Sequence, residues 1–236
     1  HRPALQRIGQ DMLAQVRASE IVDLPGLGPM LLPGPQGFVE DGATRVNPSY
    51  LPLPLLRRFA AVDRDGPWSA LAGNTLELLR QTAPHGFAPD WAAWRDGAFV
   101  ADPVRGASGS YDAIRCYLWA GLLSPRDRLF RAQLQALAGP LRRLRDGAPM
   151  WEKVDTRSGV GSGEGGYGFR AALVPYLLAQ GERGLAQSLR ASLPPPDRQR
   201  GDAPAYYAQM LTLFGDGWAE ERYRFGADGQ LQPRWR

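Results

Sequence analysis

A chain of 236 residues with 44% hydrophobic and 22% charged residues is long enough to bury a full core, and this composition excludes a generally disordered chain. The net charge of +4 is almost entirely arginine, because Lys153 is the only lysine, and the basic residues are too scattered to indicate a nucleic-acid partner. Cys116 is the only cysteine and His1 and His85 are the only histidines, so a disulfide, a cysteine- or histidine-rich metal site and a serine–histidine triad lack the residues they need. We therefore expect carboxylates to carry any catalysis, with no metal or cofactor.

Three further features bound the class of protein. No apolar run approaches the roughly 20 residues that a membrane helix needs, which predicts a chain without a membrane span. The one basic cluster, Arg142, Arg143 and Arg145, has helical spacing and is predicted to form a solvated helix face. The chain begins at His1 inside a helical pattern, so we expect a signal peptide and further residues to precede it in the natural protein.

The predicted elements, in chain order, are mainly helices. Apolar spacing, capping residues and breakers predict helices at 4–16, 51–62, 68–82, 110–122, 124 to 138 or 139, 169–180, 184–193 and 203–214. Glycine and proline density predicts a long loop with a small hairpin at 25–47, a loop with one or two short strands at 87–99, and a strand-like end at 223–235. This pattern favours a single all-α domain over 1–236, built as a helical array or α/α barrel rather than a bundle.

The segment 109–119 carries the strongest candidate for chemistry. Ser110 is the predicted helix cap, Asp112 falls in the expected first turn, and Arg115 lies three residues later on the same face. In one interpretation Asp112 only complements the helix dipole and pairs with Arg115. In the other, the same surroundings keep the carboxylate ionised, as a general base requires. The residues alone leave both interpretations open.

Aromatic residues form a second signal. Several of the seven tryptophans and eight tyrosines lie beside predicted loops, where they could stack on sugar rings, although core packing is the competing interpretation for each: Tyr50, Trp91, Trp94, Trp151, Tyr206 and Tyr207. The glycine-rich segment 159–168 lacks the Gly-Lys-Ser/Thr ending of a phosphate-binding loop and is predicted to be a mobile loop. Glu164 within it is expected to be solvated, and is a candidate acid only by default.

A set of segments in the same order along the chain matches a known family. They are 22–28, 47–52, 83–91, 109–115, 117–119, 206–207 and 211–215, so the match runs nearly from end to end. Together they resemble glycoside hydrolase family 8.

The resemblance implies an (α/α)6 barrel that hydrolyses β-1,4-glucan, as cellulose or cello-oligosaccharide, with inversion at the anomeric carbon. Such enzymes place an acid and a base carboxyl roughly 6.5–9.5 Å apart. Asp112 matches the family's general base and Arg115 an active-site arginine. Tyr50 matches a tyrosine at the water and sugar position, and Tyr206 or Tyr207 a further substrate-binding residue.

One departure from the family pattern concerns the acid. The family's general acid is a glutamate in a Ser-Glu-Gly-Gln type motif near the native N-terminus, and neither this motif nor the upstream substrate-binding aspartate occurs here. We therefore expect this chain to be the C-terminal two-thirds of the barrel and inactive alone, with the missing N-terminal segment on a separate chain, cleaved or left out. The resemblance further implies a periplasmic or secreted protein associated with the bacterial cellulose synthase complex.

Two rival interpretations remain open at this stage. A non-catalytic glycan-binding or scaffold protein could keep the groove without the acid. A lyase acting on acidic polysaccharide would suit the positive charge, but the scarcity of histidine and lysine counts against it.

Overall fold

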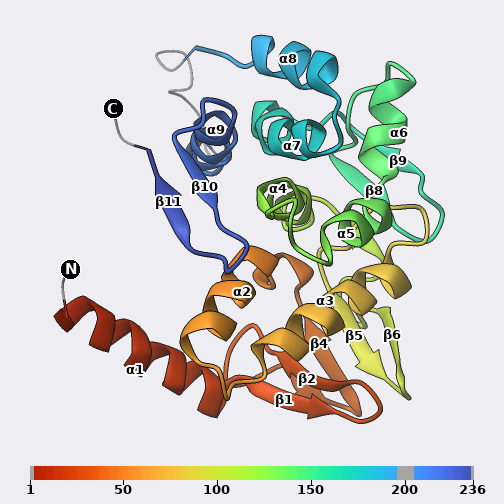
Figure 1. Cartoon of the computed structure of the whole chain (residues 1–236). Helices are drawn as coiled ribbons and strands as arrows, with labels where there is room; N and C mark the ends of the chain where they lie inside the picture. The colour runs from red at the N-terminus through yellow and green to blue at the C-terminus, as the bar shows by residue number, and fades with distance from the viewer. Residues whose placement is uncertain (1–2, 196–204, 235–236) are drawn as a thin grey trace.

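Helices are the main regular structure of the computed structural model, which describes residues 3–195 and 205–234 (Figure 1). The α-helices of these residues are α1 Pro3–Ser19, α2 Leu53–Val62, α3 Trp68–Thr82, α4 Ile114–Leu122, α5 Phe130–Ala136, α6 Gly139–Arg145, α7 Tyr167–Ala179, α8 Arg183–Ala191 and α9 Ala205–Ala219. A single 3-10 turn, η1 Pro48–Tyr50, precedes α2. No helix in the described parts of the chain is long and apolar enough to cross a membrane.

Short antiparallel strands join these helices. They are β1 Ile21–Leu24 with β2 Gly28–Leu31; β3 Val39–Glu40, β4 Ala43–Val46, β5 Ala92–Arg95 and β6 Ala98–Ala101; β7 Ser108–Gly109, β8 Lys153–Asp155 and β9 Gly161–Ser162; and β10 Tyr223–Phe225 with β11 Leu231–Pro233. The pairing of β4 with β5 brings together segments almost fifty residues apart, with Val46 opposite Ala92. It therefore places the residues that follow β4 beside those that precede β5.

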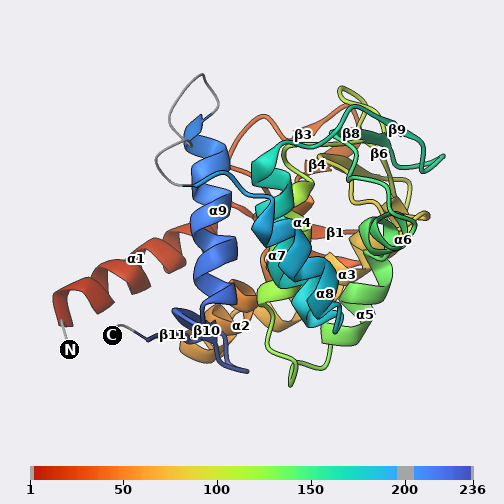
Figure 2. The ribbon, with the colours of Figure 1, turned by 90° about the horizontal axis from the view of Figure 1, so that it is seen from above.

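The larger core cluster surrounds α7, which packs against α4, α8 and α9 (Figures 1 and 2). Gly121 of α4 meets the α7 backbone, since a Cβ there would lie 2.3 Å from the Tyr176 nitrogen. Gly215 of α9 does the same on the other side, where a Cβ would lie 2.2 Å from the Ala171 carbonyl oxygen. Small residues at both contacts let three helix backbones approach closely.

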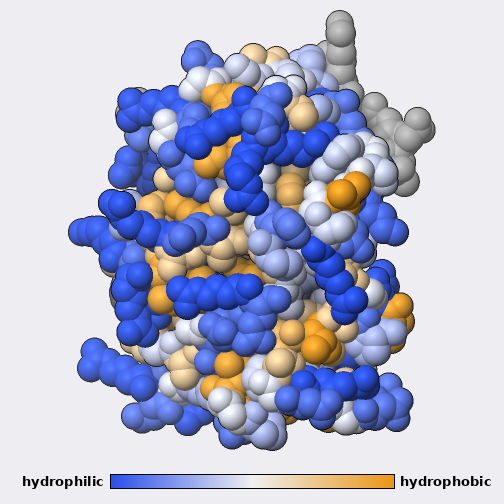
Figure 3. Space-filling model, turned by 90° about the vertical axis from the view of Figure 1, so that its right-hand side faces the viewer, coloured by the Kyte–Doolittle hydropathy of each residue, from blue (hydrophilic) through white to orange (hydrophobic). Residues whose placement is uncertain are grey.

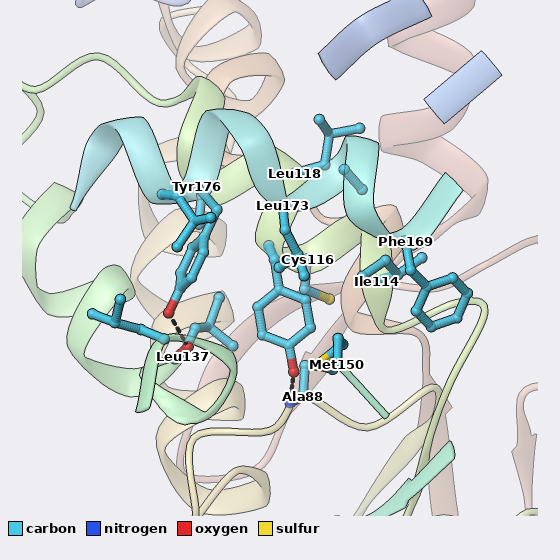
Figure 4. Packing of buried hydrophobic residues seen from close by; sticks show 14 of the residues in the cluster. Ala88, Ile114, Cys116, Leu118, Leu137, Met150, Phe169, Leu173 and Tyr176 are labelled. Atoms are coloured by element: carbon cyan, nitrogen blue, oxygen red, sulfur yellow. Dashed lines mark hydrogen bonds between the residues drawn. The ribbon is translucent and has the colours of Figure 1, made fainter. Parts of the chain in front are cut away.

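Two buried tyrosines anchor this core to neighbouring loops (Figure 4). Tyr176 of α7 donates its hydroxyl to the Leu137 carbonyl at 2.7 Å, and the Tyr117 hydroxyl of α4 accepts from the Ala88 N–H at 2.9 Å. Buried phenol groups need such partners, because an unpaired polar atom inside a core is costly. The second contact fixes the loop before β5 against the N-terminal half of α4.

A second core cluster lies under α2, α3 and the β1–β2 hairpin. Trp68 at the start of α3 is fully buried, and its indole nitrogen donates to the Asp63 carboxylate at 2.8 Å. Arg57 of α2 pairs with Asp127 at 2.5 Å, which ties this half of the molecule to the segment after α4. The two core clusters thus lie in two different parts of the molecule, one around α7 and the other under α2 and α3.

Two helices leave apolar side chains uncovered. Only Leu13 of α1 is buried, whereas Leu5, Ile8 and Met12 are 54–64% exposed. Both ribbon views show α1 extending away from the rest of the protein (Figures 1 and 2). A groove of about 1150 Å³ separates α1 from α2, and a hollow of about 840 Å³ lies between α9 and the β10–β11 hairpin. The described residues therefore form no closed barrel.

The opposite side of the molecule is better covered. Figure 3 shows it as mostly hydrophilic, with apolar residues in patches separated by polar ones. The predicted solvated face of Arg142, Arg143 and Arg145 is confirmed for Arg142 and Arg145, which are exposed, while Arg143 is half-buried; all three side chains also contact neighbouring segments. They contact the His85 carbonyl, the Trp151 ring and the Glu182 carboxylate respectively.

The predicted helical character is confirmed, and the residue range of α3 is the one expected. The helix expected from 124 to 138 or 139 is wrong in extent. Turns precede α5, and the helical structure is interrupted between α5 and α6. The helix predicted at 203–214 has its expected start at a residue outside the described ones, and α9 runs from Ala205 to Ala219, beyond the expected end. The 25–47 hairpin and the strands near 87–99 and 223–235 are present, with β1 starting earlier than expected.

Candidate active site

Three segments converge at the N-terminal end of α4. Asn47 follows β4 and Trp91 precedes β5, so the Val46–Ala92 pair places them side by side. The third segment leaves β7 at Gly109 and turns through Asp112 into α4. The sheet pairing therefore gathers residues that the sequence holds far apart.

Asp112 lies where these segments meet, with both carboxylate oxygens hydrogen-bonded. Its Oδ1 accepts from the Arg115 guanidinium at 2.7 Å. Its Oδ2 accepts from the Asn47 amide and from the Trp91 indole nitrogen, each at 3.1 Å. These three donors fix the direction of the carboxylate. The side chain is still 28% exposed, so the group remains accessible to solvent.

The Asn47 side chain is turned toward Asp112 because its amide oxygen accepts two hydrogen bonds from Ser49. The Oδ1 atom accepts from the Ser49 backbone N–H at 3.0 Å and from the Ser49 hydroxyl at 2.7 Å, which caps η1. This capping orients the Nδ2 group toward Asp112. The Asn-Pro-Ser sequence, which favours a local turn, therefore also directs a hydrogen-bond donor to Asp112.

Arg115 links Asp112 to the surrounding hydroxyls and rings. Its guanidinium donates to the Ser49 hydroxyl at 2.6 Å and to the Tyr207 hydroxyl at 3.3 Å. The same group lies 5.5 Å from the Tyr50 ring centre and 5.9 Å from that of Tyr207, within the range of cation–π attraction. The arginine is thus held from several sides.

Exposed tyrosine rings surround Asp112. Tyr50 is 46% exposed and lies edge-on to Trp91, and Tyr111 is 44% exposed. Tyr111 donates its hydroxyl to Glu152 at 2.6 Å, a bond that raises the pKa of the phenol. Tyr207 donates to the Tyr111 carbonyl, and burial raises its pKa too. Such rings combine an apolar face with a polar edge, as sugar recognition requires.

The structure separates the two adjacent candidates near the end of the chain. Tyr207 contacts both Arg115 and Tyr111. Tyr206 is 76% exposed, and no contact in the described part of the chain joins it to Asp112. Glu164 is an exposed residue whose closest ion pair is with Arg170 at 3.8 Å. Of the predicted site residues, Asp112, Arg115, Tyr50 and Tyr207 therefore lie together, while Tyr206 lies apart.

The predicted cap at Ser110 is wrong. Its hydroxyl donates to the Glu152 carbonyl at 2.6 Å, and regular helix begins only at Ile114, so Asp112 lies in the turn that leads into α4. Asp90 takes the capping role instead, since its Oδ1 accepts from the backbone N–H groups of Ser110, Asp112 and Ala113 at 2.8–3.0 Å. Burial raises the pKa of Asp90, against the three bonds that lower it.

The sequence assigned no role in the site to Asn47, Ser49 or Asp90, and it marked Trp91 only as a ring that could stack on sugars. Their segments were noted for turn signals and aromatic content, but no local pattern says that an indole or an amide will face a given carboxylate. Within the described residues no cluster of three or more histidine, cysteine, aspartate or glutamate side chains could hold a metal ion. The arrangement can hold an ionised carboxylate beside a water molecule and present aromatic rings to a ligand.

A partly exposed carboxylate with several hydrogen-bond donors, on a helical scaffold and flanked by exposed tyrosines, is an arrangement suited to binding a carbohydrate. The family model described as glycosyl hydrolases family 8 matches residues 5–221. The chain therefore belongs to glycosyl hydrolase family 8.

Individual relatives agree with the family match. An endoglucanase of Xanthomonas axonopodis pv. citri (strain 306) is 50% identical over 235 residues, which are 100% of this chain and 61% of that protein. An endoglucanase of Escherichia coli (strain K12) is 38% identical over 232 residues, 97% of this chain and 60% of that protein. The crystal structure of endo-1,4-D-glucanase from Vibrio fischeri ES114 superposes with a TM-score of 0.86 at 34% identity, covering 98% of this chain and 67% of that one. The chain thus spans about three fifths of the length of these curated relatives.

Proposed function

We propose that this chain is the base-bearing part of an inverting endo-β-1,4-glucanase that hydrolyses cellulose, with Asp112 as the general base. The observation that carries the proposal is the setting of Asp112: a partly exposed carboxylate that three side-chain donors hold in place. The relatives named endoglucanase supply the substrate class.

In the proposed mechanism Asp112 removes a proton from water while that water attacks the anomeric carbon. An acid on the opposite side of the sugar ring protonates the leaving glycosidic oxygen. Arg115 donates a hydrogen bond to the base and is itself held by Ser49 and Tyr207, so it keeps the Asp112 carboxylate oriented. The faces of Tyr50 and Tyr111 are available to sugar rings beside the reacting bond.

We further propose that the general acid is a glutamate on an N-terminal segment outside this chain, and that this segment completes an (α/α)6 barrel. Two observations support this. The chain spans 61% and 60% of two relatives. The apolar faces of α1 and α9 also lie next to open grooves of a size that further helices could fill.

The family resemblance also leads us to propose a periplasmic or secreted enzyme that works beside the cellulose synthase complex. Deleting the gene in its host should change the amount or form of the cellulose produced. Cell fractionation should recover the protein outside the cytoplasm. Cytoplasmic recovery, or unchanged cellulose, would contradict this part of the proposal.

The central experiment is a reducing-sugar assay on carboxymethylcellulose with the full-length protein and its Asp112→Asn variant. Loss of the base should lower kcat by about 10² to 10⁴-fold. Binding of cello-oligosaccharide, measured by calorimetry, should persist. NMR of the first product should show the α-anomer, as inversion requires.

Two results would overturn the proposal. A variant with wild-type rate would remove Asp112 from the mechanism. A full-length wild-type protein that binds cello-oligosaccharide without cleaving it would instead support the non-catalytic glycan-binding alternative.

A further inference from the structure

Asp90 is a carboxylate that lies next to the site without facing it. Its Oδ1 accepts from the backbone N–H groups of Ser110 at 2.8 Å, Asp112 at 3.0 Å and Ala113 at 2.8 Å. Asp90 is itself held, since its own N–H donates to the Ser108 carbonyl at 2.7 Å. One carboxylate oxygen therefore organises the whole turn that carries the proposed base.

The three amides need an acceptor from elsewhere in the chain. The first N–H groups of a helix have no intrahelical partners and are usually satisfied by a capping side chain just before them. Ala113 directly precedes α4 and has no polar side chain, and the Ser110 hydroxyl is committed to the Glu152 carbonyl. Asp90, twenty residues earlier, supplies the missing acceptor.

The next residue along the chain fixes the other end of the base. Trp91 donates its indole N–H to the Asp112 Oδ2 at 3.1 Å, so Asp90 holds the Asp112 backbone while Trp91 holds its carboxylate. The Trp91 ring is held in turn, with the Arg45 guanidinium 5.1 Å from the ring centre. Arg45 makes a two-point ion pair with the buried Asp102.

We propose that Asp90 is a positioning residue for catalysis, which fixes the turn that sets the place and direction of Asp112. The proposal rests on the proposed role of Asp112. It differs from simple helix capping because one of the three bonded amides belongs to Asp112 itself. A misplacement of a reacting group by about 1 Å can cost about 10²-fold in rate, so loss of this turn should be visible in kcat.

The test compares Asp90→Ala and Asp90→Asn in the full-length protein, with cello-oligosaccharide as substrate. Asp90→Ala removes the acceptor, so kcat should fall by about 10²-fold while KM changes little. Asp90→Asn keeps a carbonyl oxygen in the same place and should recover most of that loss. An Asn variant as slow as the Ala variant would overturn the proposal.

A matched control separates positioning from stability. The Asp127 side chain, which is 2% exposed, pairs with Arg57 and accepts the Leu129 N–H at 2.8 Å. Asp127 follows α4, whereas Asp112 precedes this helix. The nine residues of α4, at about 1.5 Å each, keep the two ends of the helix about 13 Å apart. Asp127→Ala should lower Tm but leave kcat per folded molecule unchanged. If Asp90→Ala reduces kcat no more than this control does, the proposal fails.

Hydrogen exchange gives a readout that does not depend on glucanase activity. The amides of Asp112 and Ala113 should exchange faster in Asp90→Ala than in wild type, and should be unaffected in Asp127→Ala. Unchanged exchange would overturn the positioning role. If the wild-type protein is inactive but this exchange difference is present, the proposed hydrolysis fails while the structural role of Asp90 stands.

Discussion

At the scale of single residues, Asp112 depends on donors from three separate segments. Arg115 is three residues away on the same turn, so its contact follows from helical spacing. Asn47 and Trp91 reach Asp112 only because β4 pairs with β5. The two kinds of donor should therefore respond differently to mutation.

Trp91→Phe tests the indole donor alone. The change keeps a ring in place and removes one hydrogen bond to a charged oxygen, a bond worth about 1.5–3 kcal/mol. If that bond is stronger when Asp112 carries charge during the reaction, kcat should fall by about 10- to 100-fold in the full-length protein. The measurement is steady-state hydrolysis of a cello-oligosaccharide.

Trp94→Phe is the matched control for this variant. Trp94 is buried on β5 of the same segment and packs edge-on against Phe99 at 4.8 Å between ring centres. Its replacement should lower the free energy of unfolding and leave kcat per folded molecule unchanged. Equal losses of kcat in the two variants would show that Trp91 acts only through general stability.

At the scale of elements, the contacts of α7 with α4 and α9 depend on glycine. A Cβ at Gly121 would lie 2.3 Å from one α7 backbone atom and 2.8 Å from the Pro175 carbonyl oxygen. Pro175 lies inside α7 and has no backbone N–H for a helical hydrogen bond. The packing of α4 and α9 against α7 supports the helix at this point. These contacts hold α4 in place and thereby the turn that carries Asp112.

Gly121→Ala should destabilise the protein by about 1–3 kcal/mol, because the added methyl group must push two backbones apart. Gly73→Ala is the control on α3, where an added Cβ meets nothing within 4 Å. That change should be neutral or stabilise by up to about 1 kcal/mol, since alanine favours helix. Urea denaturation of both variants checks the difference in the free energy of unfolding. Equal stabilities would contradict close packing at Gly121.

Element boundaries show where local patterns succeed and fail. The α3 helix has clear apolar periodicity, and its bounds match those predicted. The helix expected from residue 124 is interrupted because Gly139 and Pro140 begin a new one. Gly139 also packs against Gly86, where a Cβ would lie 2.8 Å from the Gly86 carbonyl oxygen. That break is stabilised by a contact distant in sequence, which periodicity does not report.

At the scale of the whole molecule, the open faces of α1 and α9 predict how the 236-residue chain behaves alone. Leu5, Ile8 and Met12 on one helix and Leu213 on the other are more than half exposed. Exposed apolar surface of this kind typically marks an interaction site or a tendency to aggregate. The isolated chain should bind a hydrophobic dye and show at most trace hydrolysis of carboxymethylcellulose.

The full-length protein provides the complementary test of this prediction. In the full-length protein the dye signal should fall and activity should appear, because helices would cover both faces and bring the acid opposite Asp112. Full activity of the 236-residue chain alone would show that the general acid belongs to this chain. That result would refute the proposed division of the two carboxylates.

The sequence by itself determined the helical class, most helix positions, the family resemblance and the candidate pair Asp112 and Arg115, because apolar periodicity and i,i+3 spacing are local properties. The tertiary structure decided which other groups surround that carboxylate. Asn47, Trp91 and Asp90 reach the turn before α4 through strand pairing and long-range hydrogen bonds. It also separated Tyr207, which contacts Arg115, from the adjacent and exposed Tyr206. Such contacts depend on how distant segments pack, and the order of residues along the chain does not specify them locally.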